Sequence, residues 1–251
     1  MERLSPQGAA SEVLRTRYPD AESLFLAGSV VRAEQTGTSD LDLVVLYERI
    51  ARARRESFGL GGWPVEAFLH DPATLRYFMD EVDRPTGVAS LACMVAEGIE
   101  VPAPTAFTRE LKRLAREHLA GGPPRWGPAQ IDASRYAITD LLEDMRDPRT
   151  RQELEASAAA LYPRVADHYL RSRQLWSARG KTIPRRLRRV SPEFATEFEA
   201  AFEAVFVRGD RDRLFALCDG LLAPDGGALF DGYQLDAPES WRKDTPLKES
   251  P

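Results

Sequence analysis

The hydrophobic pattern of the sequence changes near residue 104, and this change constrains the fold more than any other feature. Short apolar runs typical of β-strands precede it, at Ser23–Ala27, Leu41–Tyr47, Trp63–Leu69 and Ile99–Val101. Beyond Pro104 the pattern is that of long amphipathic helices, expected at 107–119, 131–145, 150–178, 192–207 and 210–222. The chain is therefore predicted to form an α/β domain followed by an all-α helical bundle.

Turn signals and chain length support the same division. With 251 residues the chain is long enough for two modest cores, and glycine-rich turns such as Gly121-Gly122 and Gly226-Gly227 punctuate the helical part. The final stretch is rich in proline and charge and poor in apolar residues. We therefore predict domains at 1–104 and 105–235 and a loose tail at 236–251.

Composition excludes several classes of protein. Hydrophobic residues make up 43% and charged residues 29%, as in folded globular chains. No apolar run approaches the roughly 20 residues that cross a bilayer, and the first residues lack the pattern of a signal peptide. A net charge of −5 argues against a protein that mainly grips long nucleic acid. A cytoplasmic protein that acts on small molecules is expected.

The cysteines and histidines give no sign of a transition-metal site. Cys93 and Cys218 lie far apart between apolar residues, which favours buried reduced thiols over a disulfide. His70, His118 and His168 are isolated from one another and lack the spacing of zinc ligands. All three are expected to be structural.

The most informative segment runs from Phe25 to Val45. An apolar strand leads into Gly28-Ser29, a short helix carrying Arg32 is expected to follow, and a polar loop returns to a strand that opens Asp40-Leu41-Asp42. A glycine at such a turn lets backbone N–H groups approach a ligand closely, and a helix start with a Ser hydroxyl favours phosphate oxygens.

The acidic residues of this region predict a metal site. Asp40 and Asp42 are two residues apart on a strand and project to the same side, while Leu41 and Leu43 point into the core. Glu66 lies on the next predicted strand and faces the same side if the two strands pair. Crowded carboxylates repel unless a cation neutralises them, so three acids are suited to two Mg²⁺ ions.

These residues resemble the nucleotidyltransferase superfamily of DNA polymerase beta. The Gly28-Ser29 turn, the loop ending in Ser39, the Asp40-Leu-Asp42 strand and Glu66 are similar to its small bacterial branch, which includes the aminoglycoside adenylyltransferases. The resemblance covers roughly residues 20 to 235 and implies a small mixed sheet with flanking helices, followed by a helical bundle that closes over the substrate.

The resemblance also implies roles and a reaction. Asp40 and Asp42 would bind both metals, and Glu66 would serve as metal ligand or as base. Gly28 and Ser29 would hold nucleotide phosphates, with Ser39 as a second contact. Lys181, in Gly180-Lys-Thr-Ile-Pro-Arg185, would contact the triphosphate. AMP would pass from Mg-ATP to a hydroxyl of a small molecule, with release of pyrophosphate.

Several residues have structural alternatives. Glu66 could be a solvated acid on an edge strand, and Lys181 could cap the preceding helix. The cluster Arg185, Arg186, Arg188 and Arg189 is interpreted as a solvated face with ion pairs. Asp140 belongs to a helical acidic stripe with Glu143, Asp144 and Asp147, and it would bind a cationic acceptor such as an amino sugar if it faces the substrate.

Two other functions remain open at the level of sequence. The acceptor could be a protein side chain or an RNA end, although the acidic charge argues against RNA. The protein could instead bind nucleotides without turnover, although all three acids are present.

Overall fold

The computed structural model describes residues 3–242, which form two compact units. The first unit, called here the sheet unit, combines the described residues up to Trp126 with Tyr169–Arg186. The second, called the helical unit, combines Gly127–His168 with the described residues from Leu187 onward. The segment that contains Lys181 therefore groups with the sheet.

The sheet unit is built on a five-stranded mixed sheet in the order β3-β4-β2-β1-β5. The central strands β2 and β4 are parallel, and the other pairs are antiparallel. The strands are β1 (Ser23–Ala27), β2 (Leu41–Leu46), β3 (Arg54–Leu60), β4 (Trp63–His70) and β5 (Ile99–Val101). The predicted small mixed sheet is confirmed, with β3 as an additional edge strand.

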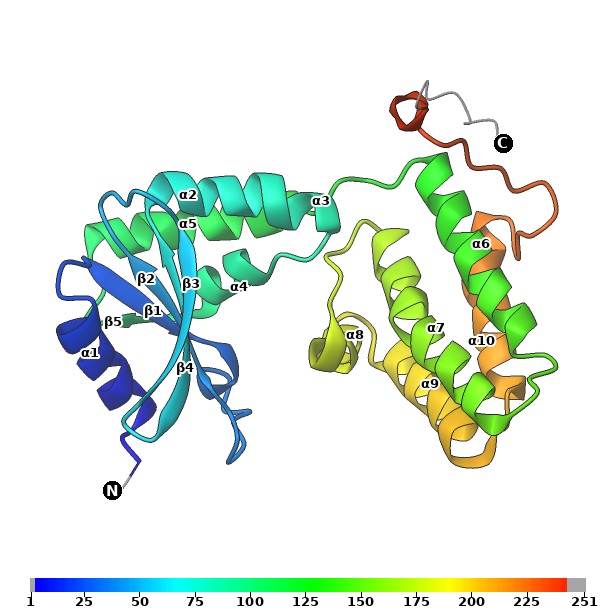
Figure 1. Ribbon diagram of the computed structural model, residues 1–251, viewed down its shortest axis with the longest axis horizontal. Helices are drawn as coiled ribbons and strands as arrows, with labels where there is room; N and C mark the ends of the chain where they lie inside the picture. Colours follow the sequence, from blue (N-terminus) through cyan, green and yellow to red (C-terminus); the bar gives the residue numbers. More distant parts are fainter. Residues whose placement is uncertain (1–2, 243–251) are drawn as a thin grey trace, which may run out of the picture. The chain divides into compact units, whose positions relative to one another are not determined.

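Helices cover both faces of this sheet (Figure 1). They are α1 (Pro6–Arg17), α2 (Pro72–Tyr77), α4 (Ser90–Glu97) and α5 (Ala106–Gly121), whereas the short α3 (Arg84–Thr86) has no buried residue. Leu41 and Leu43 pack with α1, whereas Val44 and Leu46 of the same strand pack with α4 and α5. Alternate residues of β2 therefore fill two separate cores, as expected for a central strand.

The helical unit confirms the all-α second part of the predicted fold. Its helices are α6 (Pro128–Asp144), α7 (Arg151–Arg171), α8 (Ile183–Val190), α9 (Pro192–Glu203) and α10 (Asp212–Leu222). The last residues of α7 and the first residues of α8 belong to the sheet unit, because they lie within Tyr169–Arg186. Aromatic packing contributes to the core: the Tyr162 ring meets Phe198 and Phe202 edge to face, with ring centroids 4.6 and 4.8 Å apart.

Short 3-10 and π-helical segments accompany these elements. They are η1 (Gly28–Val30), η2 (Phe78–Asp83), η3 (Gly180–Thr182), η4 (Ala204–Arg208), η5 (Ala223–Asp225) and η6 (Glu239–Trp241). Of the predicted tail at 236–251, positions 243–251 lie outside the described residues. Every helix within residues 3–242 is too short or too polar to cross a bilayer.

The helix predicted over 150–178 ends earlier, at Arg171. Gln174 adopts a left-handed conformation with φ 57°, and the amide of Leu175 donates to the carbonyl of Leu170 at 2.9 Å. This is the geometry of a Schellman-type helix end, which usually contains glycine. The chain then contacts α5, where the Trp176 indole N–H donates to the carbonyl of Leu119 at 2.8 Å.

Both cysteines are free thiols, as the sequence predicts. Cys218 is buried, and burial raises the pKa of its thiol to about 12. Cys93 is only half-buried, so the prediction of a buried thiol is wrong at that position. It lies on α4, whose buried residues are Leu91, Ala92 and Val95.

Candidate active site

Three acidic side chains meet where β2 begins beside β4. Asp40 directly precedes β2, Asp42 is its second residue, and Glu66 lies on β4 opposite Asp42 in the parallel register. Each carboxylate offers an oxygen within 4.8 Å of the oxygens from the other two. The structure thus brings together the three acids that the sequence predicts, on one side of the sheet. Their roles as ligands remain predictions.

The register of this cluster is fixed by the core. Leu41 and Leu43 flank Asp42 and are both fully buried on the opposite face. A slip of one residue would bury the carboxylates and expose the leucines, so the hydrophobic pattern determines where the acids point. Glu66 is half-buried and β4 lies between β3 and β2, so the alternative of a solvated acid on an edge strand is wrong.

The electrostatics of the cluster favour a cation. Burial, together with the neighbouring charges of Asp40 and Glu66, raises the pKa of Asp42 to about 6. The charges of Lys181 and Arg32 act in the opposite direction but do not offset this effect. Three crowded oxygen donors with mutual repulsion are a suitable ligand set for a hard divalent ion such as Mg²⁺.

Gly28 lies against the Asp42 carboxylate. It follows β1, whose last residue, Ala27, is the register partner of Asp42. Its φ of 78° favours glycine, and a Cβ at this position would lie only 2.0 Å from Oδ2 of Asp42. The absence of a side chain at Gly28 therefore leaves room for the Asp42 carboxylate. The expected helix carrying Arg32 is instead the single turn η1, which ends at Val30.

Ser29 and Ser39 are neighbours at the two ends of the intervening loop. Their Oγ atoms are 3.3 Å apart, and the Ser39 Oγ also accepts the amide of Thr36 at 2.8 Å. Both serines are half-buried beside the acids. The structure therefore brings together Gly28, Ser29 and Ser39 as the sequence predicts, while their contact with nucleotide remains a prediction.

Lys181 lies in η3 and is exposed. The alternative of a helix cap is wrong, because α7 ends at Arg171 and a separate segment of irregular chain precedes Gly180. Its charge is near enough to Asp42 to lower the pKa of that carboxyl. Lys181 thus belongs to the same unit as the acids, and its contact with a triphosphate remains a prediction.

The other basic residues of this segment have structural partners. Arg185 pairs with Glu34 at 3.2 Å, and Arg188 with Glu199 at 2.8 Å. The guanidinium of Arg186 donates to the carbonyl of Trp176 at 2.9 Å. These contacts agree with the interpretation of ion pairs and surface contacts.

Asp140 belongs to the helical unit, where it is exposed on α6. Its role toward an acceptor remains a prediction.

The glycine-rich segment that follows α10 packs on α6. Tyr233 stacks on Tyr136 with ring centroids 4.1 Å apart, and Arg135 donates to the carbonyls of Gly226 and Gly227. The segment closes the helical unit.

The histidines are held by polar neighbours. His70 lies 3.3 Å from the Thr74 hydroxyl, His118 lies 3.0 Å from Asp80, and His168 lies between Ser134 and Asp225 at 3.0 and 3.1 Å. Burial lowers the pKa of His70 to about 4. These contacts are consistent with structural roles.

Arg55 is a residue of the site that sequence reasoning missed. It lies on β3 and donates to Oε1 of Glu66 at 2.5 Å, which fixes one oxygen of that carboxylate. The signal was the Gly61-Gly62 pair between Phe58-Gly-Leu60 and the apolar run that starts at Trp63, which is typical of a two-residue hairpin turn. Recognition of this hairpin would have predicted β3 and placed it next to Glu66.

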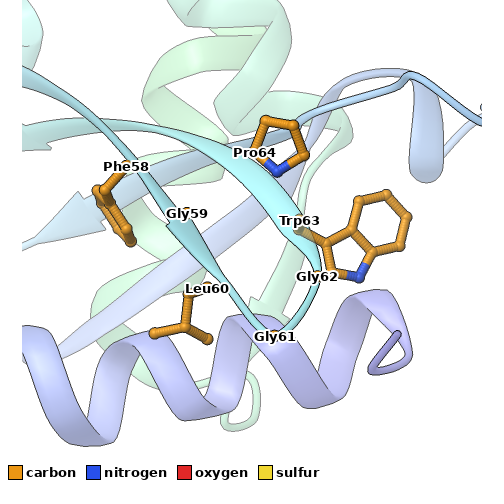
Figure 2. Close-up of a pocket in the computed structure, with 7 residues that line it drawn as sticks. All are labelled: Phe58, Gly59, Leu60, Gly61, Gly62, Trp63 and Pro64. Atoms are coloured by element: carbon orange, nitrogen blue, oxygen red, sulfur yellow. The ribbon is translucent and has the colours of Figure 1, made fainter. Parts of the chain in front are cut away.

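The same hairpin bears an open hollow (Figure 2). Its lining residues are Phe58, Gly59, Leu60, Gly61, Gly62, Trp63 and Pro64. None of these side chains ionises, and none of the three acids takes part. The hollow is therefore separate from the acidic site.

Comparison with known proteins gave a single kind of match. No protein-family model and no curated protein matches the chain. Among solved structures, the chain is similar to the crystal structure of a nucleotidyltransferase-like protein from Exiguobacterium sibiricum 255-15. The identity is 13%, the match covers 87% of this chain and 74% of that one, and the TM-score is 0.41.

Proposed function

We propose that this protein is a metal-dependent nucleotidyltransferase that transfers AMP from ATP to a hydroxyl of a small molecule and releases pyrophosphate. The observation that carries the proposal is the cluster of Asp40, Asp42 and Glu66 on two adjacent strands, with Gly28 against the central carboxylate. An oxygen-rich site beside a glycine turn suits the joint binding of divalent cations and phosphate.

The acids would hold the metal ions. Asp40 and Asp42 would bind both ions, and Glu66 would complete the site or accept the proton of the acceptor hydroxyl. When bound, the ions supply charge neutralisation at the phosphates and lower the pKa of an attacking hydroxyl. Arg55 would keep Glu66 oriented, because it engages one oxygen of that carboxylate.

The remaining residues would bind and orient the nucleotide. The turn at Gly28 leaves room for phosphate oxygens, and the hydroxyls of Ser29 and Ser39 can donate to them. Lys181 would contribute a positive charge to the triphosphate. Catalysis would depend mainly on positioning and on neutralisation of charge, as in other phosphoryl-type transfers.

A pyrophosphate-release assay tests this function. Wild type is incubated with ATP and Mg²⁺ in the presence of a panel of aminoglycosides and fractions of small molecules from a cell extract. Asp42→Asn should abolish release, whereas the matched variant Asp20→Asn, at an exposed position of the same unit, should retain it.

The acceptor class is decided by the same assay. Release that depends on a small molecule supports the proposal, and the mass of the modified acceptor identifies the transferred group. Release that instead requires a protein or RNA fraction would favour a macromolecular acceptor. Binding of Mg-ATP without release under any condition would favour a nucleotide-binding module and contradict the proposed transfer.

A further inference from the structure

Arg3 joins two parts of the sheet unit that are distant in sequence. Its Nη1 donates to the carbonyl of Gly37 at 3.2 Å, and its Nη2 donates to the carbonyl of Ser39 at 2.9 Å. The guanidinium also lies over the indole of Trp63, 3.3 Å from the ring centroid. Arg3 thus connects the loop before β2 with the first residue of β4.

Hydrogen bonds hold the backbone beside Arg3 in place. The Leu4 amide donates to the carbonyl of Gly61 at 3.0 Å, and the Trp63 indole N–H donates to the carbonyl of Leu4 at 2.8 Å. Trp63 is only 5% exposed. The backbone next to Arg3 is therefore held on the β3–β4 turn, so the guanidinium starts from a defined place.

The loop that receives these bonds ends at Asp40. Its other polar contacts near the end are local, such as the Ser39 amide to the Thr36 carbonyl at 3.1 Å. The Ser39 Oγ also meets the Ser29 Oγ at 3.3 Å, at the start of the same loop. Among the described residues, the hydrogen bonds to Gly37 and Ser39 from outside this loop come from Arg3. The carbonyl of Ser39 belongs to the peptide group shared with Asp40. A bond to this carbonyl therefore restricts the orientation of the Asp40 backbone.

We propose that Arg3 is a positioning residue for Asp40, which it holds toward Asp42 and Glu66 through the Ser39 carbonyl. The inference rests on the proposed function for its consequence at the metal site. Arginine suits this role because its planar guanidinium stacks on an indole and donates from two nitrogens at once. A lysine at this position can donate to carbonyls but cannot reproduce the stacked, forked geometry.

Two measurements on Arg3→Ala test the inference. The first is hydrogen exchange of the Thr36 and Ser39 amides, and the second is the affinity for Mn²⁺ alone, followed by electron paramagnetic resonance. Loss of these contacts should speed exchange and weaken Mn²⁺ binding by about three- to tenfold. Arg3→Lys should recover part of the exchange protection and part of the Mn²⁺ affinity. The control is Arg15→Ala, which removes an exposed arginine paired with Glu12 within α1.

The outcomes separate the inference from the proposed function. Unchanged exchange in Arg3→Ala would overturn the inference, whether or not metal binds. Faster exchange with an unchanged Mn²⁺ affinity would also overturn it, because Arg3 would then order the loop without serving the site. Absence of Mn²⁺ binding by the wild type would contradict the proposed function instead, while the exchange comparison would still decide whether Arg3 orders the loop.

Discussion

The two units each carry a cluster of acids, and the clusters differ in burial. Asp40, Asp42 and Glu66 are all half-buried beside the start of β2, with oxygens within 4.8 Å of one another. The stripe of the helical unit, formed by Asp140, Glu143, Asp144 and Asp147, is exposed, and Glu143 is paired with Arg146 at 2.9 Å. Carboxylates that the fold holds together without full hydration favour a cation, whereas solvated acids on a helix do not.

The largest expected difference between the clusters concerns catalysis. Asp40→Asn should lower the rate of pyrophosphate release by about 1000-fold or more, because a carboxylate that directs metal and phosphate would be lost. Glu143→Gln in the exposed stripe should change the rate by less than about twofold. Steady-state kinetics of both variants measure this contrast. Equal losses would show that the strand cluster has no special role.

Two glycines with the same φ sharpen the comparison. Gly28 and Gly227 both have φ 78°, but a Cβ on Gly28 would meet the Asp42 carboxylate, whereas a Cβ on Gly227 would meet nothing within 4 Å. Gly28→Ala should reduce Mn²⁺ affinity and turnover by about 100-fold, because the carboxylate must move. Gly227→Ala should carry only the conformational cost of about 1 kcal/mol. Similar activity of the two variants would contradict the steric argument.

Lys181, whose charge lowers the pKa of Asp42, should affect nucleotide binding. Lys181→Ala is expected to weaken Mg-ATP binding by about tenfold, because a charge-assisted contact with phosphate is lost. Lys181→Arg keeps the charge and should stay within about threefold of the wild type. Isothermal titration calorimetry of both variants checks this expectation. Wild-type affinity in the alanine variant would remove Lys181 from the site.

The raised pKa of Asp42 predicts a stability change that depends on pH. The pKa of Asp42 is about 6 in the folded protein, above the ordinary value of 3.8. Ionisation of Asp42 therefore destabilises the metal-free protein: the full destabilisation is present above pH 6, and it is absent below pH 3.8. Asp42→Asn should therefore raise the free energy of unfolding by about 1–2 kcal/mol at pH 8, a figure reduced for partial solvent screening. The gain should disappear near pH 4.

Urea unfolding of the metal-free wild type and the variant at both pH values measures this effect. Glu143→Gln is the matched control and should change the free energy of unfolding by less than about 0.5 kcal/mol at either pH. If Asp42→Asn raised the free energy of unfolding more at pH 4 than at pH 8, the predicted direction of the pH dependence would be wrong.

The arrangement of the acids was predictable because it depends on simple rules. Period-two alternation fixes the side on which Asp40 and Asp42 project, and the buried leucines fix the register. Placement of Glu66 required only that β4 pair with β2, which the parallel register confirms.

The contacts that surround the acids were harder to predict because they join distant segments. The end of α7 depends on a left-handed Gln174, a residue type that does not signal such a stop, so the irregular chain before Lys181 was predicted as helix. The contacts of Arg3 and Arg55 depend on the β3–β4 hairpin, and no local pattern at either arginine indicates a partner.

Metal binding itself is the most direct test of the central claim. Mn²⁺ would be titrated into the wild type, Asp42→Asn and Asp20→Asn in the presence of ATP and followed by electron paramagnetic resonance. We expect Mn²⁺ to bind to the wild type and to Asp20→Asn with equal affinity, and at least about 100-fold more weakly to Asp42→Asn. Equal Mn²⁺ binding by Asp42→Asn and the wild type would contradict the assignment of this carboxylate cluster as the active site.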